Sequence, residues 1–359
     1  MKKYKQLVLL IFLIFALVGC SKDIEYFKLD GSEFVSNDEE ISVLDAVYGD
    51  GFTYVIYITS EDNYKLAKYD MKGNKKESLD LVIDSPDAFK PFKLFYTNDV
   101  LSLVYSNLED ITITTLIFND NLEITNNLVI TNEKLSLQRY IAKNFIVVDD
   151  TVYLIKTGTV NKYSFENNEI TFENSMEFES INLVESVYNN EFYIVADINE
   201  NEFVIDGSTY QSTSNQVLLK LSNNFEYLNH ISIPEGIEVE GIKITDTVYI
   251  YGLDNANCYI AKYNKDLTLD DEIELNLVTE LYIHGVVGVQ EYDNEVRAII
   301  QNHNDFVGVF TIDFDSDEYK LLYTDESDYS VTGNNSEVIG VFDDLFIISK
   351  TSDIKVIIK

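Results

Sequence analysis

The chain has 359 residues, and 26 Lys and Arg against 62 Asp and Glu give it a formal net charge of −36. This excess of acid argues against nucleic-acid binding, because a phosphate backbone requires a basic surface. It also argues against unaided adhesion to anionic lipid headgroups. Hydrophobic residues make up 46% of the chain, which is enough for a large folded core and excludes a disordered chain.

The N-terminal segment has the organisation of a secretion signal. Three lysines precede an apolar run at 7–18, which ends at Gly19 and Cys20. The run is too short for a comfortable membrane span, which needs about 20 residues, and it suits the apolar region of a signal peptide. The order of basic residues, apolar run, small residue and cysteine resembles the signal of bacterial lipoproteins.

This resemblance implies a signal peptide at 1–19 and a diacylglycerol on the thiol of Cys20, the first residue of the mature protein. A short lipidated tether at 20–23 would then precede the folded domain, and the domain as a whole would run over 20–359. Two buried acyl chains hold a protein at a membrane, whereas one is marginal. The alternative is an uncleaved anchor helix ending near Cys20. Both interpretations place the rest of the chain outside the cytoplasm, at the cell membrane.

The remainder of the chain is built from one repeated unit. A turn rich in Asp and Asn, followed by a strand rich in β-branched and aromatic residues, recurs seven times, and its second turn residue falls at positions 50, 99, 150, 190, 246, 294 and 344. Each unit offers four short strands over about 48 residues, the period of a β-propeller blade. We therefore expect an all-β fold, a seven-bladed β-propeller with four-stranded antiparallel blades.

The last unit contains three strands, and an unassigned strand lies near the N-terminus at 24–29. We expect this N-terminal strand to complete the last blade, because closing the ring removes the exposed sheet edges that invite aggregation. The competing interpretation is that residues 21–40 form a solvated tether.

One unit carries a more specific resemblance. In residues 192–231, Val204, Gly207 and Tyr210 are followed by the sequence Leu-Lys-Leu at 219–221. This spacing resembles the repeat of bacterial seven-bladed β-propeller proteins. That repeat family is defined by its architecture, so the resemblance implies a fold and no catalytic residues.

Propeller geometry also indicates where a ligand would bind. Connections between blades share one face of the ring with the loops between the second and third strands, and the longest such loop is Asn199–Gln216. Long loops on a rigid scaffold often carry binding residues. Within this loop, we interpret Tyr210 as a residue that packs the hairpin, with a ligand anchor as the alternative.

The search for catalytic and metal-binding motifs finds one weak candidate. Asp313, Asp315 and Asp317 resemble the start of a calcium loop, in which alternate oxygens converge on one cation. The pattern departs from a complete loop, since Glu318 stands where glycine is needed and Thr324 stands at the position of the bidentate glutamate. A solvated turn is the competing interpretation, and we expect no other cofactor. Cys258, in a strand-like run, is interpreted as a small buried hydrophobe.

These observations predict a membrane-anchored extracytoplasmic lipoprotein. We expect a monomer that acts as a non-catalytic binding or scaffold module for a protein or cell-envelope partner. The alternative is an extracytoplasmic hydrolase or lyase that uses carboxylates to act on glycans, because propellers support both kinds of function. Two carboxylates about 5 to 10 Å apart in a concave site would favour the enzyme.

Overall fold

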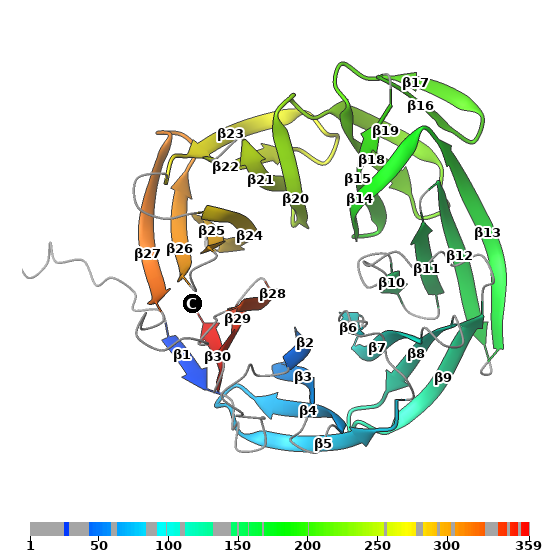
Figure 1. The fold of residues 1–359 in the computed structure, drawn as a ribbon, viewed down its shortest axis with the longest axis vertical. Coiled ribbons are helices and arrows are strands. Elements are labelled where there is room, and N and C mark those ends of the chain that lie inside the picture. Colours follow the sequence, from blue (N-terminus) through cyan, green and yellow to red (C-terminus); the bar gives the residue numbers. More distant parts are fainter. Residues whose placement is uncertain are drawn as a thin grey trace, which may run out of the picture.

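In the computed structural model the chain forms a ring of antiparallel sheets arranged around a central axis (Figure 1). The described residues are 25–28, 43–58, 63–83, 92–97, 99–107, 112–131, 145–148, 151–156, 158–166, 169–199, 201–254, 257–277, 283–292, 295–302, 306–326, 337–342, 345–350 and 353–358.

The strands form seven sheets, six of which are four-stranded antiparallel blades. Each blade runs from an inner strand near the axis to an outer strand at the rim. Three of them are β2 (Val43–Gly49), β3 (Phe52–Ile58), β4 (Tyr64–Asp70) and β5 (Lys75–Leu81); β6 (Phe92–Thr97), β7 (Val100–Asn107), β8 (Thr112–Phe118) and β9 (Ile124–Thr131); and β14 (Ile181–Tyr188), β15 (Glu191–Ile198), β18 (Gln216–Ser222) and β19 (Tyr227–Ser232).

The other three blades follow the same pattern. They are β20 (Ile237–Ile244), β21 (Val248–Asp254), β22 (Asn257–Tyr263) and β23 (Leu269–Leu275); β24 (Ile283–Tyr292), β25 (Glu295–Asn302), β26 (Phe306–Asp313) and β27 (Glu318–Glu326); and β28 (Glu337–Val341), β29 (Leu345–Lys350), β30 (Asp353–Ile358) and β1 (Glu25–Lys28).

The remaining sheet has six strands, so the prediction of seven four-stranded blades is wrong here, and the structure has six of them. This sheet consists of β10 (Phe145–Val148), β11 (Thr151–Lys156), β12 (Thr159–Glu166), β13 (Glu169–Glu179), β16 (Glu202–Ile205) and β17 (Ser208–Gln211). The hairpin β16–β17 is inserted between β15 and β18 but pairs with β13, where Phe178 lies opposite Ile205. The extra pairing covers the backbone edge of β13 and joins two neighbouring sheets at the rim (Figure 1).

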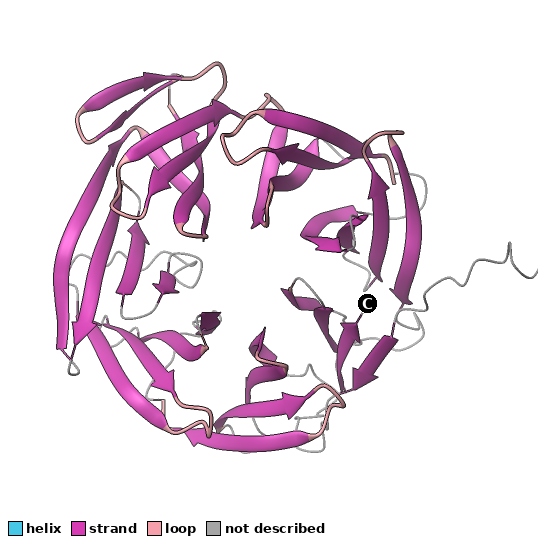
Figure 2. Ribbon diagram, turned by 180° about the vertical axis from the view of Figure 1, so that it is seen from behind, coloured by secondary structure: helices cyan, strands magenta, loops and turns pink. Residues whose placement is uncertain are grey.

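The N-terminal strand completes the sheet of β28–β30, as predicted. β1 pairs antiparallel with β30 over four residues, from Glu25 opposite Ile358 to Lys28 opposite Lys355. The inner strand β28 of this sheet contacts both β24 and β2. The first and last strands therefore lie side by side and the ring closes, as the view from behind also shows (Figure 2).

The hydrophobic core lies between the sheets. Seven clusters of buried residues each draw mainly on two neighbouring sheets. Strand β15 shows the reason: Phe192 and Ile194 belong to the cluster on one face, whereas Tyr193 and Val195 belong to the cluster on the other. Because both faces of the central strands are buried, these strands are continuous apolar runs without the alternation of a half-exposed sheet.

The turns between the third and fourth strands repeat one local structure. The side chain of the first turn residue accepts backbone N–H groups; in one case Asn119 accepts from Asn121 and Glu123. The fourth residue has a left-handed backbone, with φ of 58° at Leu122 and 65° at Phe225. Both of these side chains are buried in clusters between sheets. The packing of the apolar side chain therefore offsets the backbone strain that glycine would avoid.

A pocket between two blades as the candidate functional site

A pocket of about 540 Å³ lies between the β20–β23 blade and the β24–β27 blade. It is lined by Tyr249, Lys262, Glu291, Glu295, Val296, Thr311, Ile312, Asp313, Phe314, Asp315, Glu318, Tyr319 and Lys320. The turn between β26 and β27 contributes to its wall. In an antiparallel blade this turn shares a face with the turn between the first and second strands. The pocket therefore opens on the ring face opposite the loops where the sequence placed a ligand.

Elsewhere in the ring, a lysine on the third strand of a blade bonds to the neighbouring blade. The Nζ of Lys68 donates to the backbone oxygen of Asp120 at 3.0 Å. The Nζ of Lys220 donates to the backbone oxygen of Lys265 at 2.7 Å. Both oxygens belong to the second residue of the turn between the third and fourth strands. We call this contact the lysine clasp.

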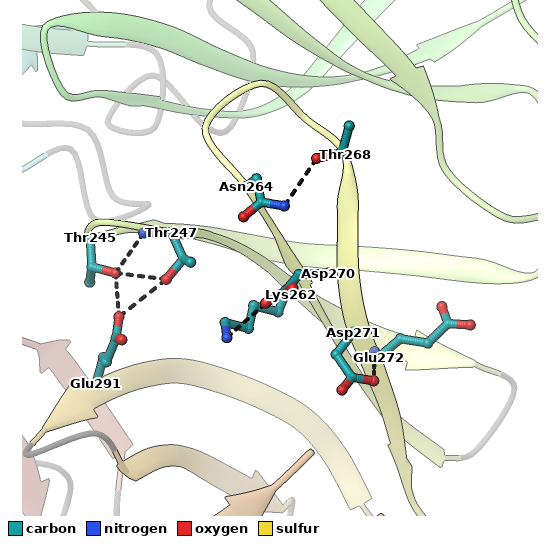
Figure 3. Close-up of polar contacts among 9 residues, drawn as sticks. All are labelled: Thr245, Thr247, Lys262, Asn264, Thr268, Asp270, Asp271, Glu272 and Glu291. Carbon is teal, nitrogen blue, oxygen red and sulfur yellow. Dashed lines mark hydrogen bonds and ion pairs between the residues drawn. The ribbon is translucent and has the colours of Figure 1, made fainter. Parts of the chain in front are cut away.

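Lys262 occupies the equivalent position, but its ion pair is with a residue of its own blade. It lies opposite Tyr249 in the β21–β22 ladder, as Lys68 lies opposite Tyr54 in its own blade. Its Nζ pairs with the carboxylate of Asp270 on β23 at 2.8 Å (Figure 3). The turn residue that would complete the clasp, Phe314, instead lines the pocket. The pocket therefore lies where the clasp is missing.

A second contact between the two blades forms one wall of the pocket. Glu291 on β24 reaches the turn between β20 and β21, where the hydroxyls of Thr245 and Thr247 donate to its Oε2 at 2.5 and 3.2 Å (Figure 3). The two hydroxyl oxygens are 3.2 Å apart. This arrangement holds the carboxylate in a fixed position through hydrogen bonds to a charged acceptor, which are stronger than neutral ones.

Tyr249 places a buried hydroxyl at the pocket. Its side chain is 0% exposed, and its hydroxyl makes no hydrogen bond of good geometry among the described residues, although Thr247 and Glu291 lie close enough to shift its pKa through hydrogen bonding. Burial raises the pKa of Tyr249, and the nearby charge of Glu291 adds to the effect. The pKa of Lys262 is also raised, first because its ammonium donates to Asp270. At neutral pH the tyrosine is therefore neutral and the lysine is charged.

The lining is acidic with an aromatic component. Five carboxylates face two ammonium groups, and Tyr249, Phe314 and Tyr319 supply rings. The hydroxyl of Tyr319 donates to the backbone oxygen of Asn276 at 2.9 Å, which ties the ring to the connection after β23.

Two of the three aspartates of the predicted calcium loop belong to the pocket lining. Asp313 and Asp315 line the pocket, whereas Asp317 does not. The carboxylate of Asp313 accepts the backbone N–H of Asp315 at 3.1 Å, and Asp317 adopts a left-handed backbone with φ of 54°. Within the described part of the chain, no group of three His, Cys, Asp or Glu side chains is placed to hold a metal ion. The segment is a hairpin turn, and the calcium site stays a prediction.

A buried carboxyl group outside the pocket has a structural role. Asp45 on β2 is 5% exposed, and burial raises its pKa despite the opposing effect of Lys93. Its Oδ2 accepts the backbone N–H of Leu94 at 2.6 Å, and its Oδ1 lies 3.5 Å from the Nζ of Lys93. Asp45 therefore connects the inner strands β2 and β6, and its oxygens are occupied.

Two further predictions concern single residues. Tyr210 packs the inserted hairpin, as predicted, with its ring centroid 5.5 Å from that of Phe203 and 4.2 Å from that of Tyr227. Cys258 is a buried free cysteine, also as predicted, and burial raises the pKa of its thiol to about 12. Cys20 and the signal segment lie outside the described residues. No helix within the described ranges is long and apolar enough to cross a membrane.

The sequence analysis missed most of the pocket residues. Tyr249 and Lys262 lie in strand segments that the repeat includes, but nothing in the repeat distinguished them, and Glu291 was not singled out. One signal could have drawn attention to this region. The tyrosine on the second strand and the lysine on the third recur in several units, so their cross-strand pairing could be compared from blade to blade.

No known family model matches the chain, and no curated protein matches it in sequence. Several solved structures are similar in fold. A catalytically inactive variant of virginiamycin B lyase from Staphylococcus aureus, solved with quinupristin, has a TM-score of 0.54 at 8% identity, over 94% of this chain and 100% of that one. The WD40 domain of coronin from Toxoplasma gondii has a TM-score of 0.53 at 10% identity, over 94% of this chain and 86% of that one.

A third similar structure is an ulvan lyase of a polysaccharide lyase family. It has a TM-score of 0.51 at 9% identity, over 93% of this chain and 96% of that one. At these identities the similarity shows the fold alone. The protein is a β-propeller, and its structural neighbours include both lyases and a WD40 domain.

Proposed function

We propose that the protein is a lipid-anchored extracytoplasmic binding propeller, which holds a polar group of a protein or cell-envelope partner without chemical turnover. The observation that carries this proposal is that neighbouring side chains hold the charged groups of the pocket in place. Glu291 is held by two threonine hydroxyls, and Lys262 is held by Asp270. Groups fixed in this way form a preorganised surface for hydrogen bonding, which favours recognition.

The membrane anchor in this proposal rests on the N-terminal sequence. The run of basic residues, apolar residues and Cys20 supports lipidation, whereas the net charge of −36 gives the rest of the protein no affinity for anionic headgroups. A tethered ring would present one of its faces, and the pocket on it, to the envelope.

The competing function is a glycan hydrolase or lyase. The gathering of Glu291, Glu295, Asp313, Asp315 and Glu318 in one concave pocket favours it, because carboxylate pairs carry out this chemistry. One observation argues against it. A catalytic acid requires a raised pKa, and burial raises the pKa of Asp45. Asp45, however, lies outside this lining, and its oxygens are bonded to the backbone N–H of Leu94 and paired with the ammonium of Lys93.

The test compares wild-type protein with Glu291→Gln in cells, by in vivo cross-linking and recovery of the membrane fraction. Glutamine keeps an acceptor for the threonine hydroxyls but removes the charge. We expect the wild type to be recovered in the membrane fraction with a cross-linked envelope component, and the variant to lose that component while staying anchored. Release of shortened glycans by the purified wild type, abolished in the variant, would overturn the proposal in favour of the enzyme.

A further inference from the structure

We propose that strand β9 (Ile124–Thr131) is a docking edge, to which an extended basic segment of a partner protein adds as a fifth strand of the blade. This edge lies at the rim of the ring and includes none of the pocket residues, so the inference goes beyond the proposed function (Figure 1). The support comes from the unpaired backbone edge of β9, from its lack of charge and from two acids in the turn before it.

The outer strands of the blades need protection from other chains. In the four-stranded blades, each outer strand has one backbone edge that pairs with no described strand, and such an edge is a template for pairing with a foreign strand. Charged side chains are a common protection. They are present on β1, β5, β23 and β27, as Glu25 and Lys28; Lys75, Lys76, Glu77 and Asp80; Asp270, Asp271, Glu272 and Glu274; and Glu318, Lys320, Asp325 and Glu326.

Two further outer strands are protected by the hairpin inserted between β15 and β18. Strand β13 pairs with β16. The end of β17 lies beside β19: the hydroxyls of Ser212 and Ser232 are 2.7 Å apart, and the Nε2 of His230 lies 2.9 Å from the backbone oxygen of Gln211. The insertion therefore packs against both of the outer strands that border it.

Strand β9 has neither protection among the described residues. Its sequence reads ITNNLVIT, which contains no charged residue and is rich in the β-branched residues that favour strands. It pairs with β8 and with no other described strand, and it contacts β13 of the neighbouring sheet without pairing to it. The side chains of Ile124 and Val129 are 47% and 49% exposed. An uncharged edge with exposed apolar side chains is suited to receive another strand.

The chemistry of the edge selects an extended peptide as its occupant. The backbone N–H and C=O groups along a free edge are spaced to pair with another strand. In β-strand addition, main-chain hydrogen bonds supply the affinity and alternate side chains supply the specificity. Side chains of the added strand would also cover Ile124 and Val129, because cross-strand neighbours lie within contact distance.

The charges around β9 select a basic partner and disfavour a second copy of this chain. Asp120 and Glu123 are exposed in the turn that precedes the strand. Lys93 is the only charged residue in the four strands of this blade, and it pairs with Asp45. A second copy would bring another net charge of −36 and be repelled, whereas a basic segment is attracted.

The experiment measures the fluorescence anisotropy of a labelled peptide, in which Thr and Val alternate between two terminal lysines, during titration with the full-length protein purified in detergent. We expect saturable binding at low salt. The same peptide with methyl groups on its interior backbone nitrogens loses its hydrogen-bond donors. It should bind at least about tenfold more weakly, which corresponds to about 1.4 kcal/mol. A peptide with glutamates in place of the lysines should also bind more weakly.

The protein variants are Ile124→Lys and Val129→Lys, which place on β9 the kind of charge that protects the other edges. Both side chains are exposed, so the fold should persist, and the melting curve checks this. We expect each variant to bind the lysine peptide at least about tenfold more weakly. The matched control is Leu269→Lys, because Leu269 begins β23 as Ile124 begins β9 and is 51% exposed; it should leave the affinity unchanged.

Absence of saturable binding, or equal binding of the methylated peptide, would overturn strand addition. Equal weakening by Leu269→Lys would reveal a general effect of charge and overturn the location. Tighter binding of the glutamate peptide would overturn the basic character of the partner. Sedimentation velocity tests the other occupant, because a wild-type dimer that Val129→Lys dissociates would assign the edge to a second copy and overturn the partner segment.

Discussion

Replacement of Asp45 tests whether this buried carboxyl, whose pKa burial raises, has a structural role. The perturbation is Asp45→Ala, which removes the acceptor of the Leu94 N–H between the inner strands β2 and β6. The accompanying ion pair with Lys93 adds little, because the side chain of Lys93 is 43% exposed and water can solvate it after the change.

The loss of stability is estimated from the backbone N–H of Leu94, which Asp45→Ala leaves without an acceptor. An unsatisfied buried N–H costs about 1 to 3 kcal/mol, so we expect the free energy of unfolding to fall by about that amount. Unfolding entropy is about 2.1 cal/mol/K per residue. For a chain of 359 residues, the melting temperature should therefore fall by about 1 to 4 °C.

The comparison variant is Asp45→Asn, which retains an acceptor for Leu94 and carries no charge. Because burial raises the pKa of Asp45, the folded state binds the proton more tightly than the unfolded state. Stability is therefore lost as pH rises from 3.8 through the raised pKa, and the cost persists at neutral pH. We expect Asp45→Asn to be at least as stable as the wild type at pH 7 and to lose this part of the pH dependence.

The assay is urea unfolding of the three proteins, followed by fluorescence and circular dichroism between pH 4 and pH 8. If Asp45→Asn destabilises the protein at pH 7 as much as Asp45→Ala does, the charge itself is stabilising and the argument from burial is wrong.

The remaining predictions concern the ring closure, the lysine clasp, the anchor and the calcium hypothesis. Deleting residues 25–28 removes the pairing of β1 with β30 and should cost about 4 kcal/mol, at about 1 kcal/mol for each of the four residue pairs; an unchanged melting transition would contradict the closure. Lys220→Met breaks a clasp and should cost about 1.5 to 3 kcal/mol, whereas Lys262→Met should cost less, so equal losses in urea unfolding would refute the distinction between them. Cys20→Ser should release the protein from the membrane fraction of cells, and its retention there would argue against lipidation. Calcium should not shift the melting temperature of the wild type or of Asp315→Ala, and a shift confined to the wild type would support the calcium site.

Local patterns were sufficient to predict a propeller of four-stranded blades, the turns and the strand that closes the ring, but they gave seven such blades where the structure has six. The recurring Asp and Asn turns, such as Asp50–Gly51 with φ of 48° and 74°, adopt left-handed backbone for reasons contained in a few residues. The pairing of β1 was predictable because a sheet that lacks a strand leaves an edge, and the only unassigned strand pattern lay near the N-terminus.

The pocket and the six-stranded sheet depended on contacts between units that are distant in sequence. Nothing near Lys262 in the chain distinguishes it from Lys220, since both follow an apolar strand pattern. Both lysines form an ion pair with a carboxylate of their own blade, Lys262 with Asp270 and Lys220 with Glu191. Lys220 also donates to the turn carbonyl of Lys265 on the next blade.

The excess of acidic residues also has one part that the sequence determines and one part that the tertiary structure determines. The sequence by itself determined that the protein is acidic, that its strands repeat and that they form a propeller, because these properties follow from composition and from local periodicity. Only the tertiary structure decided where acids converge and where they are solvated. That outcome depends on which side chains of neighbouring strands and blades meet, as Lys262 meets Asp270 beside the pocket, and packing across the ring sets those contacts.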